Sequence, residues 1–522
     1  MSANPTLALP PFVLTDSYKL SHYALYPEAQ EMSAYAEFRA PFNKDATDHR
    51  IVFYGMRYLI ESFVNKQWTA ADLALTEQFL STHNAGHTPF PFPIELFRDM
   101  IAENDGYFPV VIEALPEGSV IYPHVPVFQI TAKGKYSRLV TYLETLLTML
   151  WYPSSVATLS RRSKHAIAGA FIKTVEGADP VTGAHPILNS RLHDFGFRGC
   201  TSVEQSVIGG VAHLLNFDGS DTLSACFYAQ FHCNAGKPVG ASIPATEHSV
   251  MTSWPSERAA MANAIEKFGG GVVACVMDSY DYIHALEKVL PSIKAEKVAK
   301  GGFLVLRPDS GDPIETVLQA LRAAESTFGV TVNSKGYKAP IGCGVIQGDG
   351  INDAMLVKIL VAVEQAGYAA DSVAFGMGGG LLQKVNRDTM SFATKLNYVV
   401  DMDGTKRDVM KVPKTDAAKT SLPGKLAVVL AGPQALPTVV PFDDPAAVAA
   451  RADGTALLRV VYDGTDPAVR GRTQHWDLFD TVRARVEREW HARPPIHDPR
   501  GDAITRKMAE LVAQYRARDA SD

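Results

Sequence analysis

The sequence has few of the features that mark secreted, membrane-spanning or nucleic-acid-binding proteins. Its 522 residues include only five cysteines, which lack the paired spacing of a zinc site. No apolar run is long enough to span a bilayer. Acidic residues outnumber basic ones, 56 to 50, and the formal net charge of −6 argues against a nucleic-acid-binding surface. We therefore expect reduced thiols and no partnership with nucleic acid or membrane.

The N-terminal residues contain no Lys or Arg before Lys19, so the charged start of a secretory signal is absent. Hydrophobic residues make up 46% of the chain and charged residues 20%, as in ordinary globular proteins. We expect a soluble, cytoplasmic protein of two or three domains, preceded by a loose arm over residues 1–16.

The pattern of apolar and polar residues changes along the chain. Residues 1–150 mix helical spacing, as in 53–67 and 137–149, with β-type runs, and predict a mixed α+β domain. Residues 151–394 alternate short apolar runs with helical segments, which predicts βαβ units and a parallel sheet closed into a barrel. Residues 395–522 form a C-terminal segment with two terminal helices, part of which we expect to pack on the first domain. The expected barrel strands are 192–195, 271–276, 303–306, 344–347 and 373–375.

One predicted helix, 155–174, carries Arg161, Arg162 and Lys164 within a single turn. Such a cluster is most often a solvated charged face, and that is our interpretation of it.

Three successive strand ends carry glycine, carboxylate or cation. Arg307-Pro-Asp-Ser-Gly311 follows one apolar run, Gln347-Gly-Asp-Gly350 follows the next, and Gly376-Met-Gly-Gly-Gly380 follows a third. One such motif is equally typical of an ordinary turn. Three in a row predict the catalytic rim of a phosphate-binding β/α barrel. The glycine run matches neither a Walker loop nor a dinucleotide fingerprint.

Other strand ends offer groups that recognise a flat heterocycle. In His193–Gly199, Phe195 is suited to stack on a ring and Arg198 to bind a carbonyl or phosphate oxygen. Alternatively, Phe195 belongs to the core and Arg198 pairs with Asp194. Asp221 either accepts a hydrogen bond from a ligand N–H or caps a helix.

Two further residues have both a chemical and a structural interpretation. His248 is suited to donate a proton or to attack phosphorus, or it is a satisfied structural histidine. Asp278 either holds a metal or ribose hydroxyls, or caps the following helix.

Taken in order, these motifs resemble the nicotinamide phosphoribosyltransferases, dimeric type II enzymes of the NAD salvage pathway. The resemblance runs from Thr15 to about Gly424. It implies an α/β fold with an irregular parallel β/α barrel and an additional mixed α+β domain formed by the N- and C-terminal segments. It rests on Thr15–Lys19, Tyr54-Gly55, Trp151–Pro153, His193–Gly199, Glu247–Ser249, Asp278–Asp281, Arg307–Gly311, Asn333–Lys338, Gln347–Gly350 and Gly378–Lys384.

The resemblance implies a transfer of phosphoribose from 5-phosphoribosyl 1-pyrophosphate to nicotinamide, with active sites at the interface of a homodimer. Nicotinamide would lie between Phe195 and Tyr18 of the second subunit, with Asp16 nearby. Asp221 would accept from its carboxamide, and Arg198 would lie near its carbonyl group. The catalytic residues implied are His248, Asp309, Arg307 and Asp278.

The resemblance also implies Mg²⁺ as cofactor, held by Asp309 and Asp349, and ATP as a co-substrate that phosphorylates His248. The phosphate- and ribose-binding residues implied are Gly348, Asp349, Gly379, Gly380, Arg39, Arg387, Lys395, Lys411 and Lys419.

Two departures and two alternatives accompany the resemblance. Met377 stands where Ser is expected, and the tail beyond about residue 425 is longer and divergent. One alternative is a nicotinate or quinolinate phosphoribosyltransferase of the same fold; Asp221 favours a neutral amide, because a carboxylate repels a carboxylate. The other is a non-catalytic nucleotide-binding sensor, which would not need His248, Arg307 and Asp309 together.

Overall fold

A computed structural model describes residues 9–415, 419–472 and 474–519. Contacts within the chain divide it into two units. The first comprises Met1–Ser155, Asn386–Asp477 and Arg488–Asp522. The second comprises Val156–Val385 and Leu478–Glu487. Each unit is built from segments distant in sequence, and the C-terminal segment contributes to both.

The first unit is organised around a six-stranded antiparallel sheet in the order β14-β13-β1-β5-β3-β17. Its central strand, β1 (Ala29–Phe38), is buried along most of its length because other elements cover both faces of the sheet. The other strands are β3 (Val110–Ala114), β5 (Pro126–Lys133), β13 (Phe392–Asp401), β14 (Lys406–Asp408) and β17 (Arg459–Asp463).

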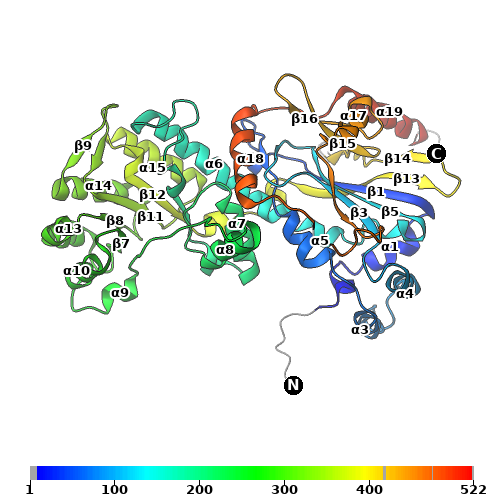
Figure 1. Ribbon diagram of the computed structural model, residues 1–522, viewed down its shortest axis with the longest axis horizontal. Coiled ribbons are helices and arrows are strands. Elements are labelled where there is room, and N and C mark those ends of the chain that lie inside the picture. Colours follow the sequence, from blue (N-terminus) through cyan, green and yellow to red (C-terminus); the bar gives the residue numbers. More distant parts are fainter. Residues whose placement is uncertain (1–8, 416–418, 473, 520–522) are drawn as a thin grey trace. The chain divides into compact units, whose positions relative to one another are not determined.

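Further elements complete this unit (Figure 1). They are α1 (Lys19–Leu25), β2 (Ile51–Val52), α3 (Ala70–Leu80), α4 (Ile94–Glu103), β4 (Val120–Ile121), α5 (Glu144–Thr148), β15 (Leu426–Ala431), β16 (Leu436–Pro441), α17 (Pro445–Ala452) and α19 (Asp502–Asp519).

The N-terminal arm is packed from Pro10 onward, so our expectation of a loose arm is wrong for most of its described part. Phe12, in the short helix η1 (Pro11–Val13), is fully buried. Its ring centroid lies 4.7 Å from that of Trp68 and 5.1 Å from that of Phe97. Edge-to-face contacts of this kind fix the segment that leads to Tyr18.

The second unit contains the parallel sheet predicted from the alternating pattern, in the order β6-β12-β11-β8-β7. Helices including α10 (Glu257–Phe268), α13 (Lys294–Lys300), α14 (Pro313–Phe328) and α15 (Asp353–Gln365) flank the strands (Figure 1). The strands are β6 (Leu192–Asp194), β7 (Val272–Val276), β8 (Phe303–Arg307), β11 (Cys343–Gln347) and β12 (Val373–Met377). All five strands expected from the sequence are therefore present.

Isolated parallel bridges close this sheet into an irregular barrel. One bridge joins Asp194 at the end of β6 to Ser220, and the next joins Gly219 to Ala241. A third joins Ala245 to Ala274 in β7, so the ladder returns to the opposite edge strand. The predicted irregular β/α barrel is thus confirmed.

Small and branched side chains pack at the centre of the barrel. Ala274, Val305, Ile346 and Ala374, one from each of four neighbouring strands, form a buried cluster against Phe195 and Ile243. A cavity of about 490 Å³ lies below them, lined at the amino ends of the strands by Val272, Phe303 and Cys343 and reaching His193 and Ser242.

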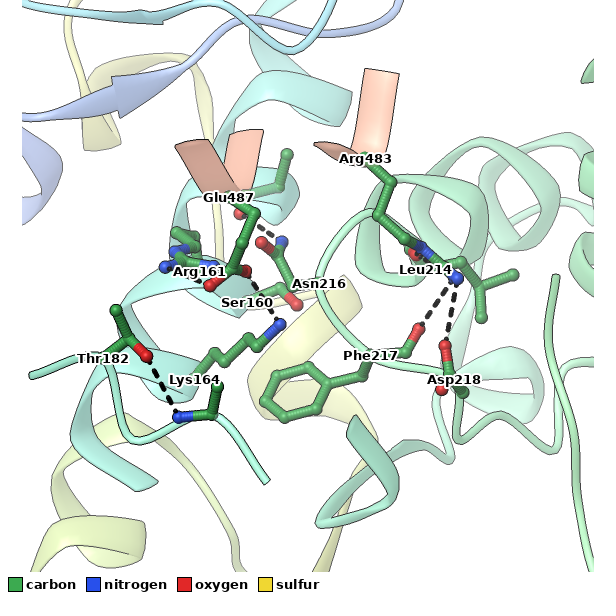
Figure 2. A network of polar contacts seen from close by, with 12 residues as sticks. Ser160, Arg161, Lys164, Thr182, Leu214, Asn216, Phe217, Asp218, Arg483 and Glu487 are labelled. Carbon is green, nitrogen blue, oxygen red and sulfur yellow. Dashed lines mark hydrogen bonds and ion pairs between the residues drawn. The ribbon is translucent and has the colours of Figure 1, made fainter. Parts of the chain in front are cut away.

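The basic cluster of helix α6 (Trp151–Thr174) is not a solvated face, so that interpretation is wrong for Arg161 and Lys164. Both side chains are buried, and both contact the Glu487 carboxylate (Figure 2). Lys164 Nζ lies 3.0 Å from Glu487 Oε2. Burial of cations requires such a partner.

Two further expectations of regular helix are only partly met. Residues 137–149 contain a 3₁₀ turn and the short α5, and residues 53–67 contain α2 (Met56–Leu59) followed by the π-helical η3 (Ile60–Val64). The five cysteines are free. Among the described residues, no helix is long and apolar enough to cross a membrane.

Candidate active site

The carboxyl ends of parallel strands meet at one edge of a sheet, and in the second unit that edge gathers most of the predicted site residues. Five loops leave it, one after each strand. Following β6, β7, β8, β11 and β12 respectively, they carry Phe195, Asp278, Asp309, Gly348 with Asp349, and Gly379 with Gly380.

His248 lies between two carboxylates at this edge. It begins the short helix α9 (His248–Thr252), and its side chain is 46% exposed. Its Nε2 is 3.4 Å from Asp309 Oδ2 and 3.8 Å from Asp278 Oδ1. On the other side of the ring, Nδ1 lies 3.1 Å from the Ser279 hydroxyl. Both ring nitrogens therefore have polar neighbours, and the ring remains accessible to a ligand.

Asp278 organises the loop after β8 and does not cap a helix. Its Oδ2 accepts a hydrogen bond from Asp309 N–H at 3.1 Å and another from the Ser310 hydroxyl. The following helix is capped by Asp281, whose side chain accepts from His284 N–H. Asp281, and not Asp278, is therefore the N-cap of that helix.

Arg307 supplies a positive charge beside Asp309. Its Nη2 lies 3.8 Å from Asp309 Oδ2, and its side chain is largely buried. The buried Nε has no hydrogen-bond partner among the described residues. A buried guanidinium donor without an acceptor suits an anionic ligand.

The Phe195 ring rests on glycine backbone. A Cβ added at Gly376 would lie 2.0 Å from Phe195 Cε2, and one at Gly348 would lie 3.0 Å from the same atom. The latter would also lie 3.8 Å from Asp309 Oδ1. The aromatic ring and the Asp309 carboxylate are therefore close neighbours.

Asp221 lies in the irregular part of the barrel, beside the end of β6. Its N–H donates to Asp194 O at 3.0 Å, and its Oδ1 accepts from the Ser242 hydroxyl. The next helix, α8 (Leu223–Tyr228), has Thr222 as its N-cap. Asp221 thus engages a neighbouring segment, and the capping alternative is not observed.

Asp194 is buried and does not serve as the partner of the exposed Arg198. Its Oδ1 accepts from Gly196 N–H at 2.7 Å, which shapes the turn between them. Burial raises the pKa of Asp194 to about 6, against the lowering effects of the Gly196 N–H and the Thr222 hydroxyl.

The glycine loop after β12 is tightly packed. Met377 is fully buried, and its carbonyl accepts a hydrogen bond from Phe195 N–H at 3.1 Å. The presence of Met where Ser is expected therefore places no side chain on the exposed rim. A Cβ at Gly380 would lie 2.3 Å from Ile351 O, which leaves room only for glycine. Asp349, exposed, donates its N–H to Gln347 Oε1.

Tyr18 and Asp16 belong to the first unit. Tyr18 is 55% exposed at the start of α1. Asp16 Oδ2 accepts from the Thr145 hydroxyl at 2.6 Å, and Lys19 pairs with Glu144. These two contacts with α5 hold the Tyr18 ring at the surface of its unit.

The predicted phosphate-binding cations also lie in the first unit. Burial lowers the pKa of Lys395; the Glu144 carboxylate opposes this, and the charges of Arg39 and Lys411 add to it. These three cations therefore form one electrostatic cluster. Arg387 and Lys419 are exposed.

Among the described residues, no group of three or more His, Cys, Asp or Glu side chains is arranged to hold a metal ion. Mg²⁺ is commonly bound by one or two carboxylates together with substrate phosphates. Asp309 and Asp349 fit that smaller requirement, since both follow neighbouring strands at the same edge.

Sequence reasoning missed Ser242 altogether and missed the contact between Ser279 and His248. Ser242 has no motif around it, and its relation to Asp221 appears only when the two segments pair. Ser279 was visible as a strand-end hydroxyl next to Asp278 and is the neighbour of His248.

Comparisons with known proteins agree with this architecture. The model of the nicotinate phosphoribosyltransferase (NAPRTase) family matches residues 190–463, and that of the nicotinamide phosphoribosyltransferase N-terminal domain matches residues 12–112.

Among curated proteins, the chain is 41% identical over 423 residues to the nicotinamide phosphoribosyltransferase of Xanthomonas campestris pv. campestris, which covers 80% of this chain and 86% of the relative. It is 30% identical over 466 residues to that of Acinetobacter baylyi, covering 80% and 88%.

Solved structures share the fold. Human nicotinic acid phosphoribosyltransferase superposes with a TM-score of 0.59 at 18% identity, covering 96% of this chain and 100% of that one. Nicotinate-nucleotide pyrophosphorylase from Pyrococcus furiosus gives 0.58 at 15% identity, covering 94% and 98%. Together with the sequence relatives, these findings show that the chain belongs to the nicotinamide phosphoribosyltransferase family.

Proposed function

We propose that the protein transfers the phosphoribosyl group of 5-phosphoribosyl 1-pyrophosphate to nicotinamide, giving nicotinamide mononucleotide and pyrophosphate for NAD salvage. The observation that carries the proposal is the adjacency of the Phe195 ring to Asp309, with Arg307 and His248 around the same carboxylate. A flat base needs an aromatic ring to stack on, and a phosphorylated sugar needs cationic and carboxylate groups close to that ring.

The reaction breaks the bond between ribose C1 and pyrophosphate and forms one between C1 and the pyridine nitrogen. Positive charge develops on the sugar and negative charge on the leaving group. Arg307 stabilises the anion, and Asp309 binds ribose hydroxyls or Mg²⁺. Phe195 fixes the plane of the base so that its nitrogen faces C1. Mg²⁺, held by Asp309 and Asp349, would screen the pyrophosphate charge.

Asp221 supports nicotinamide over nicotinate. Its carboxylate already accepts from Ser242 and has a second oxygen available for the carboxamide NH₂. The carboxylate of nicotinate would be repelled at this position. The named relatives are nicotinamide enzymes, which supports the same choice.

ATP as co-substrate is part of the proposal. His248 is half-exposed at the rim, and its ring is oriented by Ser279 and two carboxylates. A histidine held in this way is suited to accept a phosphoryl group at an accessible nitrogen.

A homodimer with sites at the interface is also proposed. Leu223, Phe227 and Phe231, spaced four residues apart, are 79%, 58% and 54% exposed. They form an apolar stripe directly after Asp221, and a second copy is the occupant that would cover it. The partner's Tyr18 and cation cluster would then complete the site. We place the enzyme in the cytoplasm, where free thiols persist.

The test is to incubate purified protein with 5-phosphoribosyl 1-pyrophosphate, Mg²⁺ and nicotinamide, nicotinate or quinolinate, and to separate the products by chromatography. We expect nicotinamide mononucleotide, and none after chelation of Mg²⁺. Product from nicotinate alone would favour the related acid enzymes, and binding without product would favour a sensor. Sedimentation of the protein tests the dimer.

A further inference from the structure

Helix α18 (Phe479–Ala492), in the divergent C-terminal segment, places one guanidinium where two barrel segments meet. Arg483 Nη2 donates to Leu214 O at 2.6 Å and to Val239 O at 3.1 Å, and Nε donates to Leu214 O at 3.0 Å. Its Nη1 lies 3.0 Å from Asp218 Oδ1 (Figure 2). One side chain therefore joins residues 214–218 to residue 239.

Both joined segments lead directly into the site. Asp218 is followed three residues later by Asp221, and Val239 is followed three residues later by Ser242. Between these points, Asp218 O accepts from Ala241 N–H at 2.7 Å, and the Ser242 hydroxyl donates to Asp221. The two segments, 218–221 and 239–242, therefore contact each other over a short length. Arg483 lies at one end of this contact, and the Ser242–Asp221 hydrogen bond lies at the other.

Beside this contact, the two segments are held by single backbone hydrogen bonds: Ser220 N–H donates to Ala241 O at 3.0 Å, and Asp221 N–H donates to Asp194 O at 3.0 Å. The segments are joined to the sheet by isolated bridges, whereas β8 and β11, which carry Arg307, Asp309 and Gly348, pair in continuous register. A perturbation of Arg483 should therefore reach the Asp221 side of the site more than the phosphate side.

The attachment of helix α18 to the second unit does not depend on Arg483. One turn further along, Glu487 pairs with Arg161 and Lys164 of α6 (Figure 2). The helix therefore stays anchored in the second unit when the arginine is shortened.

We propose that Arg483 is a positioning residue that fixes Asp221 and Ser242 for the pyridine substituent, and so gives the C-terminal segment a role in substrate selection. The proposal rests on the proposed function. A lysine in its place keeps the charge but lacks the planar fork that reaches several acceptors at once.

The experiment measures KM for nicotinamide and for 5-phosphoribosyl 1-pyrophosphate in wild type, Arg483→Lys and Arg483→Met. Arg488→Lys, on an exposed guanidinium of the same helix, is the control. We expect KM for nicotinamide to rise about tenfold or more in both Arg483 variants, since neither lysine nor methionine can donate to the carbonyls of Leu214, Phe217 and Val239 together. KM for the sugar substrate should change less than about threefold.

A double-mutant cycle with Asp221→Asn separates positioning from general stability. If Arg483 acts through Asp221, the effect of Arg483→Lys on nicotinamide should fall below about twofold in the Asp221→Asn background. Equal rises in both KM values, an unchanged nicotinamide KM in Arg483→Lys, or full additivity in the cycle would each overturn the proposal.

Two measures keep the outcome separate from the proposed function. Calorimetric affinity for nicotinamide is recorded on the same variants, so a protein that binds without turnover fails the proposed function and still tests Arg483. If the wild type converts nicotinate instead, the same ratios are taken with nicotinate. Arg483→Lys decides the matter if Arg483→Met does not fold.

Discussion

Gly376→Ala should displace the Phe195 ring and so weaken nicotinamide binding. The new Cβ would lie 2.0 Å from Phe195 Cε2 and 2.1 Å from Cδ2. Carbon atoms prefer about 3.5 Å or more, so the ring must move by roughly 1.5 Å. Overpacking of this size costs about 1–3 kcal/mol, and a misplacement of about 1 Å near reacting groups can cost about 100-fold in rate. We expect kcat/KM for nicotinamide to fall by about 10- to 100-fold.

Gly270→Ala is the matched control, because a Cβ there meets nothing within 4 Å. Steady-state rates with nicotinamide varied at saturating sugar substrate, together with the melting temperature of each variant, make the comparison. In a Phe195→Ala background the added methyl has no ring to displace, so Gly376→Ala should then cost less than about threefold. Wild-type kinetics for Gly376→Ala, or the same loss of kcat/KM in both backgrounds, would refute the position of the Phe195 ring against Gly376.

Three further predictions concern single side chains. His248→Ala should abolish ATP stimulation and incorporation of labelled γ-phosphate while leaving a slow ATP-independent transfer; undiminished labelling would exclude His248 as the acceptor. Asp221→Asn should lower the ratio of kcat/KM values for nicotinamide over nicotinate by about tenfold, and unchanged selectivity would count against its contact with the carboxamide. The pKa of Asp194 is about 6 in the folded protein and lower in the unfolded chain. As pH rises from about 4 to about 6, the unfolded chain therefore loses this proton before the folded protein does, and the free energy of unfolding falls. The loss is on the order of 3 kcal/mol and should be absent in Asp194→Asn, as measured by urea unfolding across that pH range.

The barrel could be predicted because its signals are local. Each buried parallel strand is a short apolar run that ends in glycine, aspartate or arginine or is followed by one of them within two residues. Parallel topology then places all these ends at one edge. The neighbourhood of Phe195, Asp278 and Asp309 follows from that rule. Their distances depend on loop conformations, such as the one set by Asp194 and Gly196, that no spacing rule reveals.

The β-type runs expected within residues 1–150 include β3 and most of β5, but β1 and β13 of the antiparallel sheet were missed because their pairing is non-local. β1 reads as a mixed run containing Ser33, Tyr35 and Glu37, and its partner β13 begins more than 350 residues later. The burial of Arg161 was missed for the same reason, since Glu487 is 326 residues away in sequence. A charge cluster on one helix cannot disclose a distant counter-ion.

The single bridges that close the barrel divide it into a rigid arc and a looser one. Continuous hydrogen-bond ladders join β7, β8 and β11, whose carboxyl ends carry the groups that we propose bind phosphate and ribose. The segments around Asp221 and Ser242, which we propose meet the base, are joined to the sheet by isolated bridges only. Side chains on this looser arc can therefore be exchanged without re-pairing any strand, which leaves one scaffold free to serve pyridines of different charge while its sugar chemistry stays the same.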